Sequence, residues 1–345
     1  MRVAVWGTGN MGRAGIRSVV AHPDLELVAV IGRSRAGDDA GTLAGIEPLG
    51  IAVSPDVPAD VDAVVYMASG DIRPDDAAAD IAGCLRDGAV VVTPSIYALY
   101  DPTSAPEELK GPLEAAAKEG GSALFVSGID PGWGNDVFPL LVSGIASEVT
   151  QIRCQELFDY STYDQPDAVR YSVGMGQPMS ETPIMVSPGI PTMIWGGQLR
   201  MMARGLGVQL EEIRETCERR ELEQDVTNVM GLFEKGTQGG LRFEIQGIVG
   251  GEPKIVVEHV TRIDAGVAPD WPSPADGGAG AHTIIIEGTP RIEVTIEATA
   301  EGGNRATGGN ATAAARLVNA IPWLRAAAPG LYDALDVPLA YGRLS

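Results

Sequence analysis

Three glycines that directly follow a short apolar segment constrain the fold of this chain more than any other feature. Arg2–Trp6 (R-V-A-V-W) has the composition of a buried strand, and Gly7, Gly9 and Gly12 follow it in the pattern G-x-G-x-x-G. A helix is expected to begin near Met11. A strand, a glycine turn and a helix in this order are typical of folds that hold a phosphate-bearing ligand at the turn.

Each glycine has a mechanical role in such a turn. The first permits the tight turn, the second lets the backbone approach a pyrophosphate, and the third lets the helix pack against its strand. The diphosphate would lie at the helix N-terminus, where free N–H groups and the helix dipole favour negative charge. The pattern therefore predicts that the turn binds a dinucleotide. The residues expected to bind it are Gly7, Thr8, Gly9, Asn10, Met11 and Gly12.

The residues beyond the turn support this interpretation. Ile16, Val19 and Val20 lie at helical spacing and are expected to face inward, and Leu25–Ile31 predicts a second strand. A chance G-x-G-x-x-G is usually an ordinary turn, whereas this one has a strand before it and a helix and a strand after it. The context favours a dinucleotide-binding unit.

Residues 1–127 continue to alternate between strand and helix signals. Short β-branched runs of this kind are typical of parallel strands that are buried on both faces. Together they predict an α/β fold with a doubly wound parallel sheet of the Rossmann type. The expected strands are Val61–Ala68, Ala89–Thr93 and Ala123–Val126, and the expected helices are Pro74–Asp87 and Pro112–Gly120.

The pattern changes in residues 128–305. Longer, half-exposed strands joined by compact turns predict antiparallel hairpins. This segment is expected to form a second, α+β domain with a largely antiparallel sheet and a helix over Pro191–Arg204. Residues 306–345 are expected to pack back on the N-terminal domain, with helices at Ala311–Val318 and Trp323–Ala327. The expected strands are Val149–Phe158, Leu241–Val249, Lys254–Arg262, Thr283–Glu287 and Arg291–Glu297.

The charge of the chain disfavours several classes of partner. The formal net charge is −21 at pH 7, which argues against nucleic acid and against anionic membrane surfaces. No apolar run reaches transmembrane length, and the chain enters a strand at once without a signal-like segment. Cys84, Cys154 and Cys217 have no metal-ligand spacing, so no metal site is expected. They predict buried free thiols in a reducing compartment, and hence a cytoplasmic location.

The end of the second strand bears on which nucleotide binds. NAD-specific folds place an acidic residue there to accept hydrogen bonds from the ribose hydroxyls. Here Arg33, Ser34 and Arg35 follow Ile31, and the first carboxylate is Asp38. Two arginines around a hydroxyl can hold a 2′-phosphate through charge-assisted hydrogen bonds. NADP is therefore expected rather than NAD, the alternative being that the arginines only make a surface loop more soluble.

Two loops are expected at the carboxyl ends of the fourth and fifth strands, where open α/β sheets bind ligands. The first loop, 68–71 (A-S-G-D, ending at Asp71), is small enough for close approach of a nicotinamide ribose. The second is 93–97 (T-P-S-I-Y). The residues expected to contact the cofactor in these loops are Ala68, Ser69, Gly70 and Ser95.

Hydride transfer to a C=O or C=N group needs a proton source or a charge stabiliser at the heteroatom. Tyr97 is the best-placed candidate by loop position. A phenol has a pKa of about 10 and needs a nearby cation to act near neutrality, and the nearest lysines belong to the following helix. His22, His259 and His282 are each expected to be structural rather than catalytic.

A third loop follows the sixth strand, and it holds a tryptophan between glycines. Trp133 is expected to form a wall of the substrate pocket together with Asn135. The alternative for the polar residues is that Asn135 or Asp136 caps a helix over Val137–Leu141. A second aromatic cluster, Tyr160 and Tyr163 with Asp164 beside them, either lines the same pocket or packs between the domains. The expected pocket residues are Trp133, Asn135, Tyr160 and Tyr163.

Several segments together resemble the family of native amine dehydrogenases and 2,4-diaminopentanoate dehydrogenases, which have a dihydrodipicolinate-reductase-like N-terminal domain. The resemblance implies a Rossmann domain, an α+β domain that forms both the pocket and a homodimer interface, and reversible NAD(P)H-linked reduction of an imine or carbonyl. The segments that carry it are Arg2–Gly12, Asp39–Gly45, Gly128–Asp136 (G-I-D-P-G-W-G-N-D), Tyr163–Pro166 and Arg316–Pro322.

One departure from the family pattern affects the expected reaction. Amine-dehydrogenating members place a glutamate in the loop after the fifth strand, where this chain has Ser95–Ala98 (S-I-Y-A). The expected function is an oxidoreductase that transfers a hydride from NAD(P)H to a small, largely apolar ketone, aldehyde or imine. The alternative is a non-catalytic NADP-binding sensor or scaffold that has kept the fold and lost the chemistry.

Overall fold

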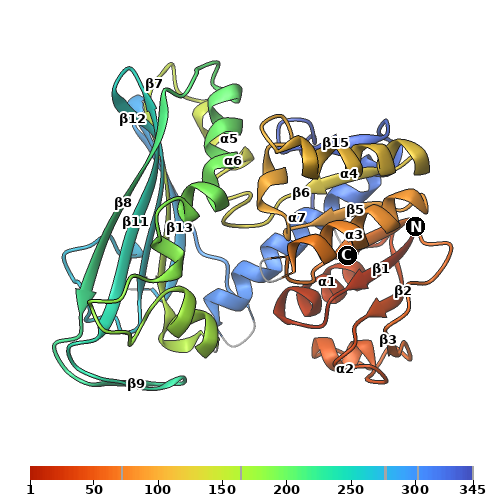
Figure 1. The fold of residues 1–345 in the computed structure, drawn as a ribbon, viewed down its shortest axis with the longest axis horizontal. Coiled ribbons are helices and arrows are strands. Elements are labelled where there is room, and N and C mark those ends of the chain that lie inside the picture. The colour runs from red at the N-terminus through yellow and green to blue at the C-terminus, as the bar shows by residue number, and fades with distance from the viewer. Residues whose placement is uncertain (71–72, 164, 276–277, 301–302, 344–345) are drawn as a thin grey trace. The chain divides into compact units, whose positions relative to one another are not determined.

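The computed structural model describes residues 1–70, 73–163, 165–275, 278–300 and 303–343. Contacts between residues divide the chain into two compact units (Figure 1). Unit 1 contains Met1–Trp133 and Gly309–Ser345, and unit 2 contains Gly134–Gly308. The N-terminal unit is therefore built from both ends of the chain.

Unit 1 contains a seven-stranded sheet in the order β15-β6-β5-β4-β1-β2-β3, and all its strand pairs are parallel. The predicted doubly wound parallel sheet is confirmed. The strands are β1 (Arg2–Trp6), β2 (Glu26–Ile31), β3 (Val53–Ser54), β4 (Ala63–Tyr66), β5 (Val90–Thr93), β6 (Ala123–Val126) and β15 (Gly330–Tyr332). The helices are α1 (Asn10–Ala21), α2 (Ala40–Ala44), α3 (Pro74–Arg86), the 3₁₀ helix η1 (Tyr97–Tyr100), α4 (Glu107–Gly120) and α7 (Arg305–Ala326), whose first residues belong to unit 2.

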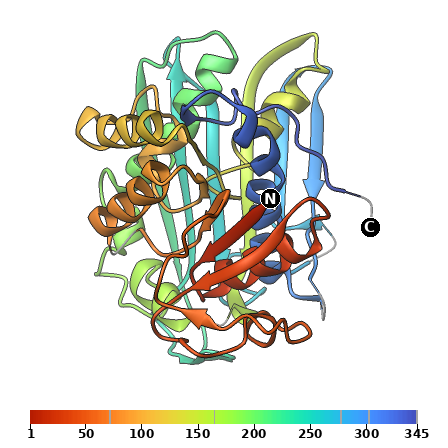
Figure 2. The same ribbon diagram turned by 90° about the vertical axis from the view of Figure 1, so that its right-hand side faces the viewer.

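Helices lie on both faces of this sheet (Figure 2), and alternate side chains of the strands pack against them. Val3 and Val5 of β1 pack in one apolar cluster with α1 and α7, to which Leu317 and Ile321 contribute. Ala4, between them, packs in a second cluster with α3 and α4. A period of two along a strand covered on both faces gives this arrangement.

Two details of unit 1 differ from the sequence-based expectation. Val20 is 42% exposed, because the buried stripe of α1 runs through Ile16 and Val19 and ends there. The two expected C-terminal helices form the single helix α7, which continues through Pro322. Ile321 and residues on either side of it are buried, so packing holds the helix together where proline removes a hydrogen bond.

Unit 2 contains a six-stranded sheet in the order β14-β13-β7-β12-β11-β8, in which only β7 and β12 pair in parallel. The predicted largely antiparallel sheet is confirmed. The strands are β7 (Glu148–Asp159), β8 (Glu212–Glu221), β11 (Gln238–Val249), β12 (Glu252–Arg262), β13 (Gly280–Thr289) and β14 (Ile292–Ile296), and β9 (Val226–Asn228) pairs with β10 (Gly231–Phe233). The helices are α5 (Val137–Ser143), α6 (Ile190–Gly205), the 3₁₀ helices η2 (Tyr160–Thr162) and η4 (Ile184–Val186), and the π-helical turn η3 (Ala168–Ser172).

The expected half-exposure of these strands is wrong for β11, β12 and β13, most of whose residues are buried. Trp195 of α6 packs against one face of the sheet. On the other face, charged side chains form ion pairs that shield them from solvent, such as that of Arg153 with Glu258. β8 was not expected, because its residues (E-I-R-E-T-C-E-R-R-E) are mainly charged and it lies at the edge of the sheet.

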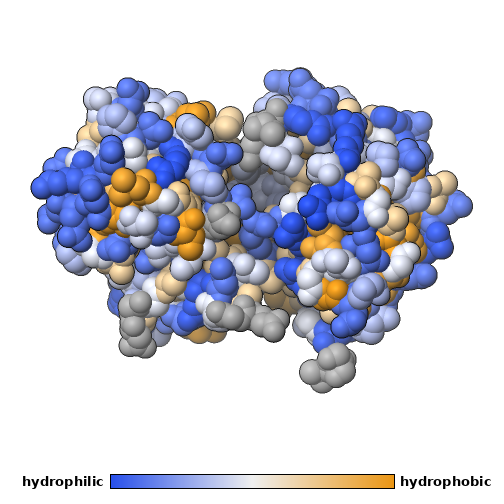
Figure 3. Space-filling model, turned by 90° about the horizontal axis from the view of Figure 1, so that it is seen from below, coloured by the Kyte–Doolittle hydropathy of each residue, from blue (hydrophilic) through white to orange (hydrophobic). Residues whose placement is uncertain are grey.

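The face drawn in Figure 3 is mainly hydrophilic, with hydrophobic groups scattered over it. Among the described residues, no helix is long and apolar enough to cross a membrane. Cys217 is exposed, so the expectation of a buried thiol is wrong at this position.

Candidate functional site

The glycine turn of unit 1 has the geometry that its sequence predicts. Gly7 has φ +130°, and a Cβ there would lie 2.8 Å from the carbonyl carbon of Met67. A Cβ on Gly12 would lie 2.0 Å from the carbonyl oxygen of Gly7, so only glycine lets α1 pack this close. A Cβ on Gly9 would meet nothing within 4 Å. The first and third glycines are therefore required by the fold, and the second one keeps space open.

This open space lies at the N-terminus of α1. Gly9 is the N-cap residue, no side chain caps the helix, and its first turn has no acidic residue. Thr8 is half-buried, Asn10 is exposed and Met11 is half-buried. The N-terminus of α1 has no capping side chain, and open space surrounds the position of a Cβ on Gly9. A pyrophosphate fits such a site.

The two arginines in the loop after β2 differ in their ion pairing. Arg33, Ser34 and Arg35 are all exposed. The guanidinium of Arg35 lies 2.6 Å from the carboxylate of Asp38, whereas Arg33 forms no ion pair with any described residue. The loop therefore presents one arginine that is available and one that already has a carboxylate partner.

The loops after β4 and β5 meet at the carboxyl ends of the strands. The Ser95 hydroxyl donates a hydrogen bond to the carbonyl of Ala68 at 2.6 Å. A Cβ on Gly70 would lie 1.9 Å from the carbonyl oxygen of Ser95, so the two backbones touch. Ser69 is exposed between them. Asp71 lies outside the described residues.

Tyr97 begins η1 and packs, partly buried, against the apolar cluster under α3 and α4. In the same turn, the hydroxyl of Tyr100 donates to the carbonyl of Pro94 at 3.1 Å. The structure thus places Tyr97 at the start of η1, four residues after the end of β5 and two residues beyond Ser95.

The loop after β6 folds tightly around its glycines. The Trp133 amide donates to the carbonyl of Gly128 at 3.1 Å, and the Trp133 indole N–H donates to the hydroxyl of Thr312 at 3.0 Å. Asp136 caps α5, since its carboxylate accepts from the amide of Val137. The capping alternative is therefore confirmed for Asp136. Asn135 is fully buried.

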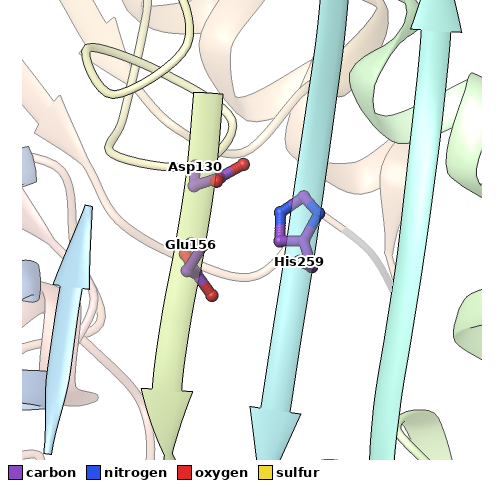
Figure 4. Close-up of side chains that lie close together, drawn as sticks. All are labelled: Asp130, Glu156 and His259. Carbon is purple, nitrogen blue, oxygen red and sulfur yellow. The ribbon is translucent and has the colours of Figure 1, made fainter. Parts of the chain in front are cut away.

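A row of side chains crosses the sheet of unit 2 on the face that α6 covers. Glu156 of β7 pairs in register with His282 of β13 on one side and with His259 of β12 on the other. Figure 4 shows Glu156 and His259 on their neighbouring strands; Asp130, also labelled there, belongs to unit 1. From one sheet edge to the other, the row is Ile296, His282, Glu156, His259, Phe243 and Cys217.

The two histidines have different surroundings. The His282 Nε2 lies 3.3 Å from a carboxylate oxygen of Glu156, and its ring meets the Phe158 ring edge-on at 5.4 Å. The His259 ring stacks on Phe243 at 4.5 Å and contacts Trp195 of α6 at 4.4 Å. Aromatic rings therefore enclose the row on both sides of Glu156.

The predicted tyrosine pair lies beside this row. Tyr160 and Tyr163 have ring centroids 4.8 Å apart, and Tyr160 lies 6.4 Å from Phe158. Burial, and then the negative charge of Glu156, raise the pKa of Tyr163. The charge of Glu156 therefore acts on the ionisation of Tyr163 in the tyrosine pair. Asp164 lies outside the described residues.

Glu156 was not predicted from the sequence, and His259 and His282 were both expected to be structural. The available signal was that His259 falls within one expected strand and His282 directly precedes another. The pairing register brings them beside one carboxylate, and a register between distant strands is not readable from one sequence.

A doubly wound parallel sheet with an uncapped helix after its first strand, followed by a mixed-sheet unit, defines a Rossmann-type dehydrogenase fold. Two family models match the chain. Residues 135–344 match the 2,4-diaminopentanoate dehydrogenase C-terminal domain, and residues 1–68 match the N-terminus of dihydrodipicolinate reductase.

Individual proteins agree with these matches. The chain is 62% identical to an amine dehydrogenase of Streptomyces virginiae, over 99% of this chain and 97% of that protein. It is 25% identical to the 2,4-diaminopentanoate dehydrogenase of Acetoanaerobium sticklandii, over 98% and 94%. The solved amine dehydrogenase of Mycobacterium smegmatis has the same fold, with a TM-score of 0.76 at 20% identity and coverage of 99% and 97%.

The chain belongs to the family of amine dehydrogenases and 2,4-diaminopentanoate dehydrogenases, so the predicted resemblance is confirmed. Membership makes the protein an oxidoreductase, and a Rossmann-type dehydrogenase implies a nicotinamide cofactor.

Proposed function

We propose that the protein interconverts a small, largely apolar amine and its ketone or aldehyde through the imine, with NADP as the cofactor. The observation that carries the proposal is the identity of 62%, over 99% of the chain, to an amine dehydrogenase. Both the carbonyl and the imine remain candidate substrates for reduction, because the family glutamate is missing from Ser95–Ala98.

The proposed cofactor site follows from the geometry of unit 1. The backbone of Gly7–Gly12 would hold the pyrophosphate, Arg33, Ser34 and Arg35 the 2′-phosphate, and Ala68–Gly70 with Ser95 the nicotinamide ribose. When bound, the nicotinamide supplies or accepts a hydride. The residues of the chain would orient it and exclude water.

Side chains are also proposed for the substrate. Tyr97 is the proposed proton donor to the heteroatom of a carbonyl substrate, and Trp133, Asn135, Tyr160 and Tyr163 are the proposed substrate contacts. Replacing Tyr97 with Phe tests the first assignment, because unchanged turnover would mean that another group supplies the proton.

The function is tested with a panel of small ketones and aldehydes, each with NADPH or NADH and with or without ammonia. Ammonia-dependent oxidation of NADPH supports an amine dehydrogenase, and ammonia-independent oxidation supports a carbonyl reductase. A protein that binds NADPH tightly and oxidises none would contradict the proposal and favour a non-catalytic sensor.

We also propose that unit 2 forms a homodimer interface. Light scattering coupled to size-exclusion chromatography tests this proposal, and a monomer at micromolar concentration would contradict it.

A further inference from the structure

We propose that Glu156 binds the ammonium group of the amine substrate and accepts a proton from it. This inference rests on the proposed function. It assigns to a strand of unit 2 the carboxylate role that the loop Ser95–Ala98 of unit 1 lacks.

The hydrogen bonding of Glu156 leaves it able to bind a cation. Its carboxylate side chain is 17% exposed and meets His282 through one oxygen, Oε2, at 3.3 Å. Glu215, on β8, shows the contrast. Its two oxygens accept hydrogen bonds from the amides of Gly189 and Thr192 and from the Thr192 hydroxyl, at 3.0, 2.8 and 2.5 Å, and so cap α6. Glu215 has a structural role, whereas the second oxygen of Glu156 receives no hydrogen bond from a described residue.

The surroundings of Glu156 suit an organic ammonium group. Phe158 lies two residues beyond Glu156 on β7 and forms a contiguous aromatic cluster with Tyr160 and Tyr163. The charge of Glu156 contributes to the raised pKa of Tyr163. A carboxylate next to aromatic faces attracts a cation twice, through its charge and through the rings. A neutral ketone or alcohol gains neither attraction.

The row across the sheet also fixes the position of the carboxylate. Glu156 lies in the middle strand of three, in register with a histidine on each side, and regular pairing makes that backbone rigid. His282 is 5% exposed and contacts Glu156 directly, so we assign it a positioning role.

The proposed step transfers one proton from the substrate to Glu156. One N–H bond of the ammonium group breaks, its proton moves to a carboxylate oxygen of Glu156, and the electron pair stays on nitrogen as a lone pair. That lone pair is what the neighbouring carbon needs when its C–H bond is oxidised. In the reverse direction the protonated carboxyl returns the proton.

The test measures binding of cyclohexylammonium, and of cyclohexanol as its neutral counterpart, to the full chain saturated with NADPH, where no turnover occurs. Calorimetry would compare the wild type, Glu156→Gln and Glu148→Gln. Glu148 is an exposed carboxylate at the start of the same strand and serves as the control.

We expect Glu156→Gln to raise the Kd of cyclohexylammonium at least tenfold and to change the Kd of cyclohexanol less than twofold. Glu148→Gln should change neither. An unchanged ammonium affinity in folded Glu156→Gln would overturn the inference, as would ammonium binding that disappears on addition of EDTA. If Glu156→Gln does not fold, Glu156→Ala takes its place, because it also removes the carboxylate, and an unaltered Kd and kcat for the amine would equally refute the role.

Failure of the proposed function gives a different result. A wild-type protein that neither binds cyclohexylammonium nor oxidises any amine would show that amines are not its substrates, and would overturn the proposed function. A wild type that oxidises amines, together with a Glu156→Gln variant of unchanged kcat and Kd, would remove only the assignment to Glu156.

Discussion

Arg33 and Arg35 lie two residues apart, yet they should contribute unequally to cofactor choice. Arg33 has no ion-pair partner among the described residues, and Arg35 is held by Asp38 at 2.6 Å. We expect Arg33→Ala to weaken NADP binding by about 1.5–3 kcal/mol, the size of a hydrogen bond to a charged group. Arg35→Ala should cost less, because its guanidinium must first leave a carboxylate.

Fluorescence titration of both variants with NADPH and NADH checks this prediction. NADH affinity should change little, since NADH has no 2′-phosphate for either side chain to bind. An equal loss of affinity for the two cofactors would show that the arginines act on the loop rather than on the phosphate.

Single residues were predictable from the sequence where their role depends on neighbours in the chain. Gly7 and Gly12 could be assigned because a turn and the helix that follows it are local. Asp136 was one of two capping candidates for the same reason. The proposed role of Glu156 could not be predicted, because it depends on His259 and His282. These residues are distant in sequence, and strand pairing alone brings them beside Glu156.

At the scale of elements, the contact of α1 with the turn before it gives a matched pair of variants. A Cβ at position 12 would lie 2.0 Å from a backbone oxygen, so Gly12→Ala should lower the free energy of unfolding by about 1–3 kcal/mol. Gly9 has φ −77° and room for a Cβ. Gly9→Ala should therefore keep its stability but weaken binding of both NADPH and NADH.

Urea denaturation and cofactor titration separate the two effects. If Gly9→Ala binds both cofactors as the wild type does, the open space at α1 is not where the pyrophosphate lies.

Three strands of unit 2 share a buried carboxylate. Glu258 of β12 is 1% exposed and accepts hydrogen bonds from Arg153 at 2.5 Å, from Gln155 at 2.8 Å and from Arg242 at 2.8 Å. Glu258→Gln removes the buried charge, but Arg153 still pairs with Glu244 and Arg242 with Glu218, so the loss of charge-assisted hydrogen bonds should cost about 1.5–3 kcal/mol of stability at pH 7. Equilibrium unfolding in urea measures this loss, and a cost under about 1 kcal/mol would mean that solvent reaches the cluster.

The same group predicts a pH dependence. Burial alone would raise the pKa of Glu258, but the hydrogen bond from Gln155 and the charges of Arg153 and Arg242 outweigh it, so the pKa is lowered. A carboxyl whose pKa is lower in the folded state stabilises the fold above its unfolded pKa of about 4.3. That contribution disappears as the pH falls through the folded pKa. The stability gap between wild type and Glu258→Gln should therefore shrink below about pH 4, and a gap that widens there would contradict the assignment.

Elements with a strong apolar pattern were predicted, and those whose position the rest of the sheet decides were not. β1, β5 and β6 are apolar runs that the sequence locates within a residue. β8 is polar and forms because β11 offers it an edge. The burial of β12 was underestimated, because its charged residues are covered by partners from β7 and β11.

At the scale of the whole molecule, unit 1 depends on the last part of the chain. Leu317 and Ile321 of α7 are fully buried in the cluster that contains Val3 and Val5, and β15 extends the sheet beside β6. Each buried side chain of this size contributes about 1.5–3 kcal/mol. Deleting residues 309–345 should therefore abolish the cooperative unfolding of unit 1, whereas deleting only 339–345, where Leu339 and Tyr341 are exposed, should not.

Hydrogen exchange of the β1 amides checks the truncations. Protection of β1 that survives the longer deletion would show that α7 is dispensable to the sheet.

The closure of unit 1 by α7 also affects how the protein is made. During translation the first six strands of the unit 1 sheet leave the ribosome before Gly134–Gly308, and the part of α7 that belongs to unit 1 emerges only after that segment. At ordinary elongation rates the delay is roughly ten to thirty seconds. Throughout it, the apolar surface that Leu317 and Ile321 will cover stays open on the nascent chain. Chaperones should therefore be needed mainly by residues 1–133, although the residues that complete their core, 309–345, are translated last.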